Sequence, residues 1–350
     1  MSDKLKIGLT LSGGGAKGAY QVGVVKALAE MNVSVDAISG ASIGSLNGGV
    51  VASAPSLNEA AVRLESLWSE LSRLQILQAN PSSYLLFLQK SGLKFNGAII
   101  RKALSKLGFE TSHLVEEKGL LKEDPLRVML DKYLDSNALN NGIPMFVSVF
   151  ESNGFFHDIL TNLPSILHLT DGKNSDFFNV QSLPIDDQKE ALLASAAIPF
   201  LFEPKMVGGK IYCDGGLGGW KNSQGNTPVT PLIQNECDLI IVSHLEDGAL
   251  WDRNQFPNTT FIEVRPQSNI SRNEGFFSGA KDVLGFDSDN VHSWINQGYL
   301  DTLHCVGNVQ KVLSSRSKLS ESKGILSASE SKNTNADNLL REAIQLLTRP

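Results

Sequence analysis

A short glycine-rich motif places a serine where it could act as a nucleophile. Gly40-Ala41-Ser42-Ile43-Gly44 has the form G-x-S-x-G and lies between a predicted strand, 33–39, and a predicted helix, 43–52. In this context the glycines permit a sharp turn that presents the serine hydroxyl, and the start of the helix points at the reacting centre. Ser42 is therefore a candidate nucleophile, although a Gly/Ser-rich stretch also matches this pattern by chance.

A second glycine-rich loop, 12–18, follows the predicted strand 6–11 and precedes the predicted helix 19–31. Its backbone N–H groups are free to converge on an anion. Acyl transfer needs such donors, because negative charge develops on the carbonyl oxygen, and one donor contributes about 10²–10³ in rate. The loop is a candidate oxyanion hole, and a tight structural turn is the alternative.

The same loop also matches a dinucleotide-binding fingerprint. Gly13, Gly15 and Gly18 have the spacing G-x-G-x-x-G, and Asp36 follows at the distance of a ribose-binding acid. Against this interpretation, the strand runs on past Asp36 into the Ser42 turn. A phosphate-binding G-x-x-x-x-G-K-[ST] loop is excluded, because the residue after Lys17 is a glycine.

An aspartate at the end of another short strand is the third candidate. Asp214-Gly215-Gly216 follows the apolar segment 210–213. Most aspartates before glycines only form turns. A catalytic role requires a partner, and Ser42 could be that partner.

Together, the loop at Gly13–Gly18, the motif at Gly40–Gly44 and the Asp214–Gly216 sequence resemble the patatin-like phospholipase family. Two further stretches, 194–199 and 226–232, also resemble it. The resemblance covers about residues 6–245, whereas 68–140 and 246–350 match nothing that we can name. Gly216 stands where that family commonly has alanine, which is a small change.

The resemblance implies a Ser–Asp dyad without histidine, with Ser42 as the nucleophile and Asp214 as the proton acceptor. It implies an acyl-enzyme intermediate, no cofactor and no metal, and a phospholipid or lysophospholipid substrate. The implied oxyanion-hole residues are Gly13, Gly14, Gly15 and Ile43. The remaining motif glycines are Gly18, Gly40, Gly44, Gly215 and Gly216. Lys17 stands where the family has a basic residue, either near a lipid phosphate or simply at the surface.

Strands alternate with helices, which predicts an α/β fold with a central, mostly parallel sheet flanked by helices. We expect a catalytic domain at 6–245 with a helical insertion at about 68–140, and a C-terminal extension at 246–313 packed on it. The serine-rich segment 314–334 predicts a linker, and 335–350 predicts a final helix.

Several alternatives stay open. His244 ends an apolar strand and could complete a Ser–Asp–His triad. The apolar patch Tyr84–Leu88 could be core or a surface that contacts lipid. A dinucleotide-binding oxidoreductase and a non-catalytic lipid-binding module are the rival functions. Some bacterial patatin-like enzymes are activated by cyclic nucleotides in antiphage defence, so a nucleotide activator is also open.

Composition narrows the class of protein. Of the 350 residues, 41% are hydrophobic and 19% charged, which excludes a disordered chain. The net charge of −6 argues against non-specific nucleic-acid binding. Three widely spaced cysteines form no disulfide framework and no metal-binding cluster. The N-terminus shows no signal sequence, so we expect a cytoplasmic protein with at most peripheral membrane contact.

Overall fold

The computed structural model describes residues 5–73, 125–152, 173–197, 202, 204–218, 224–246, 251–270 and 288–347. Contacts between Cα atoms divide the chain into two compact units, residues 1–303 and 304–350. The apolar patch Tyr84–Leu88 and most of the predicted insertion at 68–140 lie outside the described residues.

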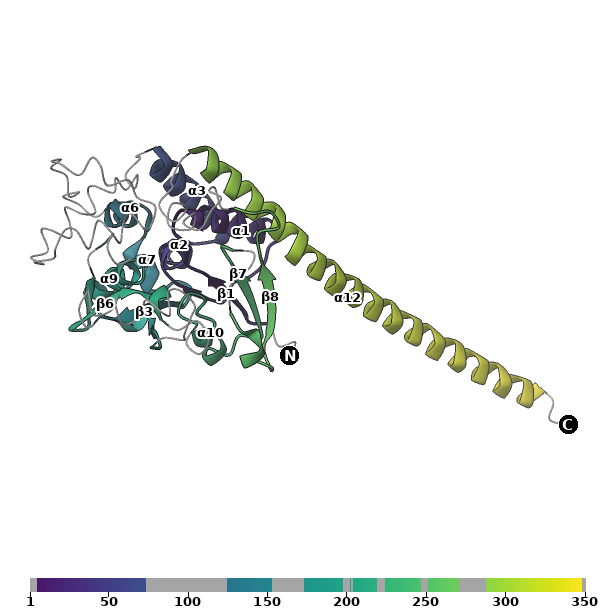
Figure 1. Ribbon diagram of the computed structural model, residues 1–350. Coiled ribbons are helices and arrows are strands. Elements are labelled where there is room, and N and C mark those ends of the chain that lie inside the picture. Colours follow the sequence, from purple (N-terminus) through teal and green to yellow (C-terminus); the bar gives the residue numbers. More distant parts are fainter. Residues whose placement is uncertain are drawn as a thin grey trace, which may run out of the picture. The chain divides into compact units, whose positions relative to one another are not determined.

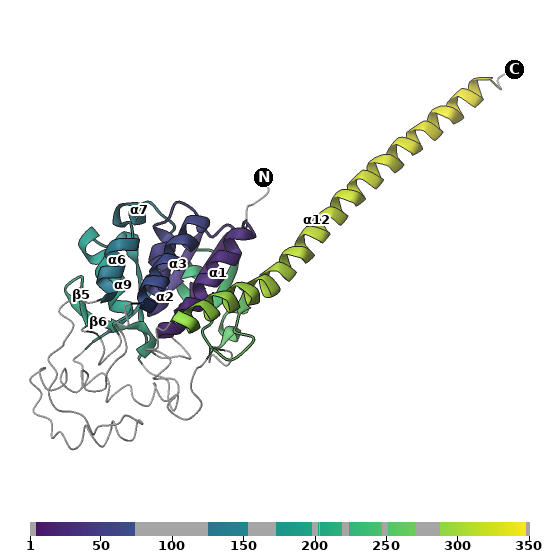
Figure 2. The same cartoon turned by 90° about the horizontal axis from the view of Figure 1, so that it is seen from above.

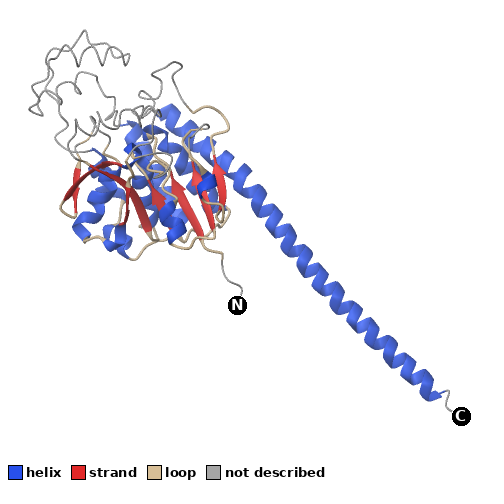
Figure 3. Ribbon diagram, turned by 60° about the horizontal axis from the view of Figure 1, so that its bottom comes forward, coloured by secondary structure: helices blue, strands red, loops and turns tan. Residues whose placement is uncertain are grey.

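The first unit is built on one sheet, which has eight strands within the described residues (Figure 3). In spatial order the strands are β5 (Lys205–Val207), β6 (Lys210–Asp214), β3 (Met145–Glu151), β2 (Ala37–Gly40), β1 (Ile7–Leu11), β7 (Leu239–Ser243) and β8 (Thr260–Val264), and β4 (Asp176–Asn179) also pairs with β3. The neighbours from β3 to β8 are parallel, whereas β3 pairs antiparallel with β4 and β6, and β5 with β6. The predicted α/β fold with a mostly parallel sheet is confirmed.

One layer of helices covers one face of the sheet (Figure 2). It contains α1 (Ala19–Glu30), α2 (Ile43–Ala52), α3 (Leu57–Arg73), α6 (Pro125–Tyr133) and α9 (Ile185–Ser195), and the short α7 (Ser136–Asn140) follows α6. Ile38 of β2 faces α2, since a Cβ built on Gly48 would lie 3.2 Å from its side chain. The small Gly48 therefore lets α2 lie directly on the strand that leads to Ser42.

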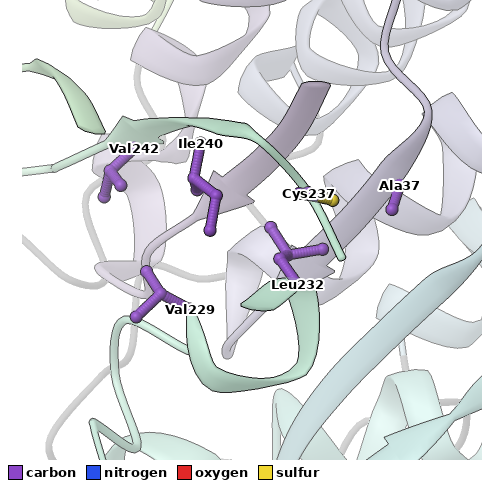
Figure 4. Close-up of a cluster of buried hydrophobic side chains, with 6 residues drawn as sticks. All are labelled: Ala37, Val229, Leu232, Cys237, Ile240 and Val242. Carbon is purple, nitrogen blue, oxygen red and sulfur yellow. The ribbon is translucent and has the colours of Figure 1, made fainter. Parts of the chain in front are cut away.

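The short helix α10 (Thr230–Gln234) covers the opposite face (Figure 1). Alternating strand residues point to this side and pack with α10 in a buried apolar cluster (Figure 4). Its members are Ala37, Val229, Leu232, Cys237, Ile240 and Val242. Because successive strand residues face opposite sides, the sheet is apolar on both faces, as a parallel sheet that is covered on both faces requires.

Residues beyond 245 also take part in the first unit. β8 extends the sheet beside β7. The start of α12 (Ser288–Leu347) packs closely on α1, because a Cβ on Gly23 would lie only 1.9 Å from the carbonyl oxygen of Ile295. Tyr20 Oη donates to Asp301 Oδ2 at 3.0 Å. The expected domain boundaries at 245 and 313 remain predictions.

The second unit lies within the C-terminal part of α12. The helix continues through 314–334, where the serine content predicted a linker. Serine disfavours a helix interior by only about 0.5 kcal/mol relative to alanine, a weak preference that neighbouring leucine, lysine and glutamate oppose. The segment also contains no proline, so nothing in it forces the helix to end.

Candidate active site

Ser42 occupies a strained turn between β2 and α2. Its backbone has φ 52° and ψ −127°, a conformation that costs a non-glycine residue about 1–3 kcal/mol. Its N–H donates to Ser195 Oγ at 3.0 Å. Glycine is required on both sides, since a Cβ on Gly44 would lie 2.1 Å from the carbonyl oxygen of Leu11 and one on Gly40 would lie 2.4 Å from that of Gly44. The predicted elbow geometry is thus present.

The glycine-rich loop lies directly against Ser42. A Cβ on Gly13 would be 2.9 Å from the Cβ of Ser42. The two segments are adjacent because they follow β1 and β2, which pair with Leu11 opposite Gly40. A Cβ on Gly18 would lie 2.6 Å from Ile43 Cγ1, so this glycine lets the end of the loop approach the start of α2.

The backbone N–H groups around Ser42 differ in their availability. The Gly13 N–H donates to the carbonyl oxygen of Asn226 at 3.2 Å, so it is already used. Within the described part of the chain, the N–H groups of Gly14, Gly15 and Ile43 have no acceptor. Ile43 is also the first residue of α2, where the helix dipole is positive. Three of the four expected oxyanion donors are therefore available, and Gly13 instead holds the loop in place.

Asp214 meets Ser42 from an antiparallel strand. β6 pairs with the end of β3, and Asp214 lies opposite Val149. β3 continues past the end of β2, where Val147 is opposite Gly40. Asp214 therefore arrives beside the turn that follows β2. Its N–H donates to the carbonyl oxygen of Ala197 at 3.1 Å.

The Asp214 carboxyl is buried and only partly satisfied. Oδ1 accepts the Gly216 N–H at 2.8 Å. Burial raises the pKa of Asp214 to about 6, while hydrogen bonding by the Ser42 hydroxyl and the Gly216 N–H partly opposes this rise. Oδ2 has no partner at ordinary hydrogen-bond geometry among the described residues, so the contact with Ser42 is loose. Such contacts are often long in the absence of substrate.

Asn226 is a site residue whose role the sequence did not indicate. Its Nδ2 donates to the carbonyl oxygen of Gly13 at 3.3 Å. Its Oδ1 would lie 2.4 Å from a Cβ on Gly13 and 2.9 Å from a Cβ on Gly216. Next to it, Thr227 Oγ1 and Ser12 Oγ are hydrogen-bonded at 3.0 Å. The sequence placed Asn226 only within a family-like stretch, whereas the structure places it between the glycine-rich loop and the Asp214 turn.

Lys17 and His244 do not join the Ser42–Asp214 pair. Lys17 is 3% exposed and its Nζ lies 3.5 Å from Glu246 Oε1, so the interpretation as a surface lysine was wrong. His244 is fully buried, with Nε2 at 3.2 Å from Glu263 Oε2 and its ring against Trp251. Burial lowers the pKa of His244 and favours a neutral ring.

The dinucleotide alternative fails on the position of Asp36. This residue precedes β2, where its Oδ2 accepts the Ile7 N–H at 2.9 Å. It therefore lies where β1 and β2 begin, at the opposite end of these strands from the loop at Gly13–Gly18. A ribose-binding acid has to lie at the same end as the phosphate-binding loop.

The described residues contain no group of three or more His, Cys, Asp or Glu residues that could hold a metal ion. No helix among them combines the length and apolar character needed to cross a bilayer.

The fold and the site define an α/β protein with a serine elbow, a glycine-rich loop and a buried aspartate. A family model described as patatin-like phospholipase matches residues 9–232, which is more than half of the chain. The chain belongs to the patatin-like phospholipase family, as its motifs predicted.

Curated relatives match a short part of the chain. This chain is 40% identical over 95 residues to patatin-like phospholipase domain-containing protein ZK370.4 of Caenorhabditis elegans. Over 93 residues it is 37% identical to patatin-like phospholipase domain-containing protein 7 of Rattus norvegicus and 36% identical to neuropathy target esterase sws of Drosophila melanogaster. Each match spans 27% of this chain but only 6% or 7% of the relative.

Two solved structures are similar over most of the chain. VipD from Legionella pneumophila is 15% identical with a TM-score of 0.41, and the match covers 87% of this chain and 67% of VipD. The type III effector protein ExoU is 16% identical with a TM-score of 0.41, and the match covers 87% of this chain and 53% of ExoU.

Proposed function

We propose that the protein is a serine acyl hydrolase that cleaves lipid esters through an acyl-enzyme on Ser42. The observation that carries this proposal is the buried carboxyl of Asp214, which lies beside the Ser42 hydroxyl and has one oxygen without a partner among the described residues. A pKa of about 6 leaves this carboxyl ionised at neutral pH, yet makes it a stronger base than an exposed aspartate.

In the first half-reaction, Ser42 Oγ attacks the ester carbonyl carbon and its proton passes to Asp214. The negative charge on the carbonyl oxygen is stabilised by the N–H groups of Gly14, Gly15 and Ile43 and by the start of α2. Collapse of this intermediate breaks the ester C–O bond. The leaving alcohol takes the proton from Asp214, and the acyl group stays on Ser42.

In the second half-reaction, water attacks the acyl-enzyme while Asp214 accepts a proton from it. The same N–H groups stabilise the second oxyanion. When the bond to Ser42 Oγ breaks, the proton returns to the serine and the carboxylic acid is released. Ser42 and Asp214 are the two side chains that gain or lose a proton in these steps, so the mechanism needs no histidine.

Family membership supports a phospholipid or lysophospholipid as the ester. The intact Ser42 and Asp214 argue against a module that only binds lipid. Contact with a bilayer and activation by a nucleotide remain predictions from the sequence resemblance.

The test combines labelling with product analysis. A fluorophosphonate should label wild-type protein at Ser42 and should not label Ser42→Ala. Mass spectrometry of a phospholipid and lysophospholipid mixture should show free fatty acid with the wild type alone. Labelling at another residue, or fatty acid release by Ser42→Ala, would contradict the proposal.

A further inference from the structure

The second unit carries a row of large apolar side chains that points to solvent. From residue 312 onward every seventh position of α12 is apolar, apart from one asparagine. The row is Val312, Leu319, Leu326, Asn333, Leu340 and Leu347. The apolar members are between 56% and 87% exposed. Seven residues make nearly two turns, so these side chains form one continuous stripe along the helix.

A second row, three residues further along, consists of small side chains. Its members are Ser315, Ser322, Ser329, Ala336 and Ala343, and all are exposed. Positions separated by three and four residues alternate along the seam of a two-helix coiled coil. The helix therefore presents a seam with one large and one small core position in each heptad.

This helix has little to stabilise it alone. Residues 318–344 are all exposed, and serine and asparagine are frequent among them. Gly324 lies in their midst with open space where a Cβ would be, and it costs a helix interior about 1 kcal/mol relative to alanine. Helices of such composition depend on packing of an apolar face.

We propose that residues 304–347 of two copies of the chain pair as an antiparallel coiled coil. The two-fold axis passes between residues 327 and 328, so that residue numbers facing each other add up to 655. Each large residue then meets a small one: Leu319 faces Ala336 of the second copy, and Leu340 faces Ser315. At the centre Leu326 faces Ser329.

A parallel pair fits these side chains less well. It would place the residues of the large row opposite each other in one layer and the small residues, serine or alanine, opposite each other in the next. The small layers would leave voids, which cost stability in proportion to their volume. Asn333, the one polar residue of the large row, also fits the antiparallel pair, because it then faces the hydroxyl-bearing Ser322.

Charged residues beside the seam also favour the antiparallel orientation of the two helices. In the antiparallel register Lys323 lies beside Glu330 of the second copy, and this pair occurs twice by symmetry. In a parallel pair Lys323 would instead meet Lys318 of the second copy. Unlike charges at these flanking positions select partner and orientation in coiled coils.

Sedimentation equilibrium of the full chain should show a monomer–dimer equilibrium in the micromolar range. Lys323→Glu should raise the dissociation constant about tenfold, because it places two carboxylates together at two places. Adding Glu330→Lys should restore wild-type affinity. A parallel pair predicts the opposite sign for Lys323→Glu, so tighter dimers, unchanged affinity or a monomeric wild type would overturn the proposal.

Core substitutions test the seam itself. Leu326→Ala with Leu340→Ala keeps good helix formers and should weaken the dimer at least about tenfold, since buried leucines are lost on both copies. Ser331→Ala, which lies away from both rows, is the matched control and should change nothing. Equal dissociation constants for the two variants would show that the apolar row is not the interface.

Disulfide formation tests the register. Ser322→Cys and Asn333→Cys are made in separate, differently sized chains that both carry Cys305→Ser, and are mixed under mild oxidation. The antiparallel register predicts a disulfide between the two different chains. Disulfides only between identical chains would establish a parallel pair, and none at all would exclude the proposed register.

Discussion

Asn226 and Gly13 exchange two hydrogen bonds, although they lie 213 positions apart in the chain. The Gly13 N–H donates to the Asn226 carbonyl, and the Asn226 side chain donates back to the Gly13 carbonyl. The loop that supplies two of the proposed oxyanion donors is thereby tied to the segment beyond Asp214. Asn226 is therefore a positioning residue for the proposed reaction.

Replacing this side chain should loosen the loop. Asn226→Ala should lower kcat by about ten- to a hundredfold, less than the loss of a whole oxyanion donor, with little change in KM. The reason is that the donors act mainly on the transition state. Steady-state kinetics on a soluble ester measures the changes in kcat and in KM separately. Thr227→Val, which removes only the neighbouring bond to Ser12, serves as a control. A mere rise in KM would contradict the positioning role.

Asp214→Asn should abolish hydrolysis almost as completely as Ser42→Ala. Asparagine keeps the shape and the acceptor for the Gly216 N–H, but it cannot take a proton. Members of a catalytic unit give similar losses when removed singly. Initial rates of ester hydrolysis by both variants, each checked for folding, provide the comparison.

The complementary variant in this experiment replaces His244. Its neighbours are Glu263 and Trp251, so His244→Asn should keep the rate of the chemical step in whatever fraction stays folded. Titration of active sites with a fluorophosphonate corrects for the folded fraction. If His244→Asn is inactive while Asp214→Asn remains active, the result would contradict the Ser–Asp dyad and support a catalytic triad.

The pH dependence of kcat/KM should reflect Asp214. The carboxyl must be ionised to accept a proton, and its pKa is raised to about 6. Activity should therefore rise with pH through about 6 and level off above it, as expected for one essential base in the free enzyme. Rates measured between acidic and mildly alkaline pH give the profile. A flat profile across this range would mean that a different group is the base.

The same carboxyl should make folding stability depend on pH. Its pKa is about 6 in the folded chain against 3.8 as the ordinary value, so the folded state holds the proton more tightly. The tighter binding of the proton stabilises the folded state by about 3 kcal/mol. This stabilisation is fully present below about pH 4 and is lost as the pH rises through about 6. Asp214→Asn does not ionise. It should therefore unfold at a higher temperature than wild type at pH 8, and the gap should close at acidic pH.

Local features of the fold were predictable from the sequence. The helix expected at 43–52 begins at Ile43 and ends at Ala52. Its start is set by nearby residues, because the glycines on both sides of Ser42 permit the sharp turn from which the helix begins. The strained backbone of Ser42 follows in the same way from the flanking glycines.

Features that depend on distant pairing were not predictable from spacing. Asp214 reaches Ser42 only because β6 lies antiparallel on the end of β3, and no local pattern encodes that register. The resemblance to a family supplied the pairing instead. Lys17 is buried, and its Nζ lies 3.5 Å from Oε1 of Glu246, a residue far away in sequence. The positioning role of Asn226 has the same origin, since it follows from contacts between separate loops.

Ser195 offers a test of the strained turn itself. The Ser42 N–H donates to Ser195 Oγ, and both residues are buried. Ser195→Ala removes the acceptor and leaves this N–H without a partner, which should cost about 1–3 kcal/mol of unfolding free energy. Because the lost bond holds the nucleophile, the rate of fluorophosphonate labelling should fall as well, at a temperature where the variant is fully folded. Ser53→Ala is the matched control, since it removes another buried hydroxyl, bonded to Val50 O, without touching the turn. If both variants lose stability but label at the wild-type rate, Ser195 supports the fold alone and the turn keeps Ser42 in place without it.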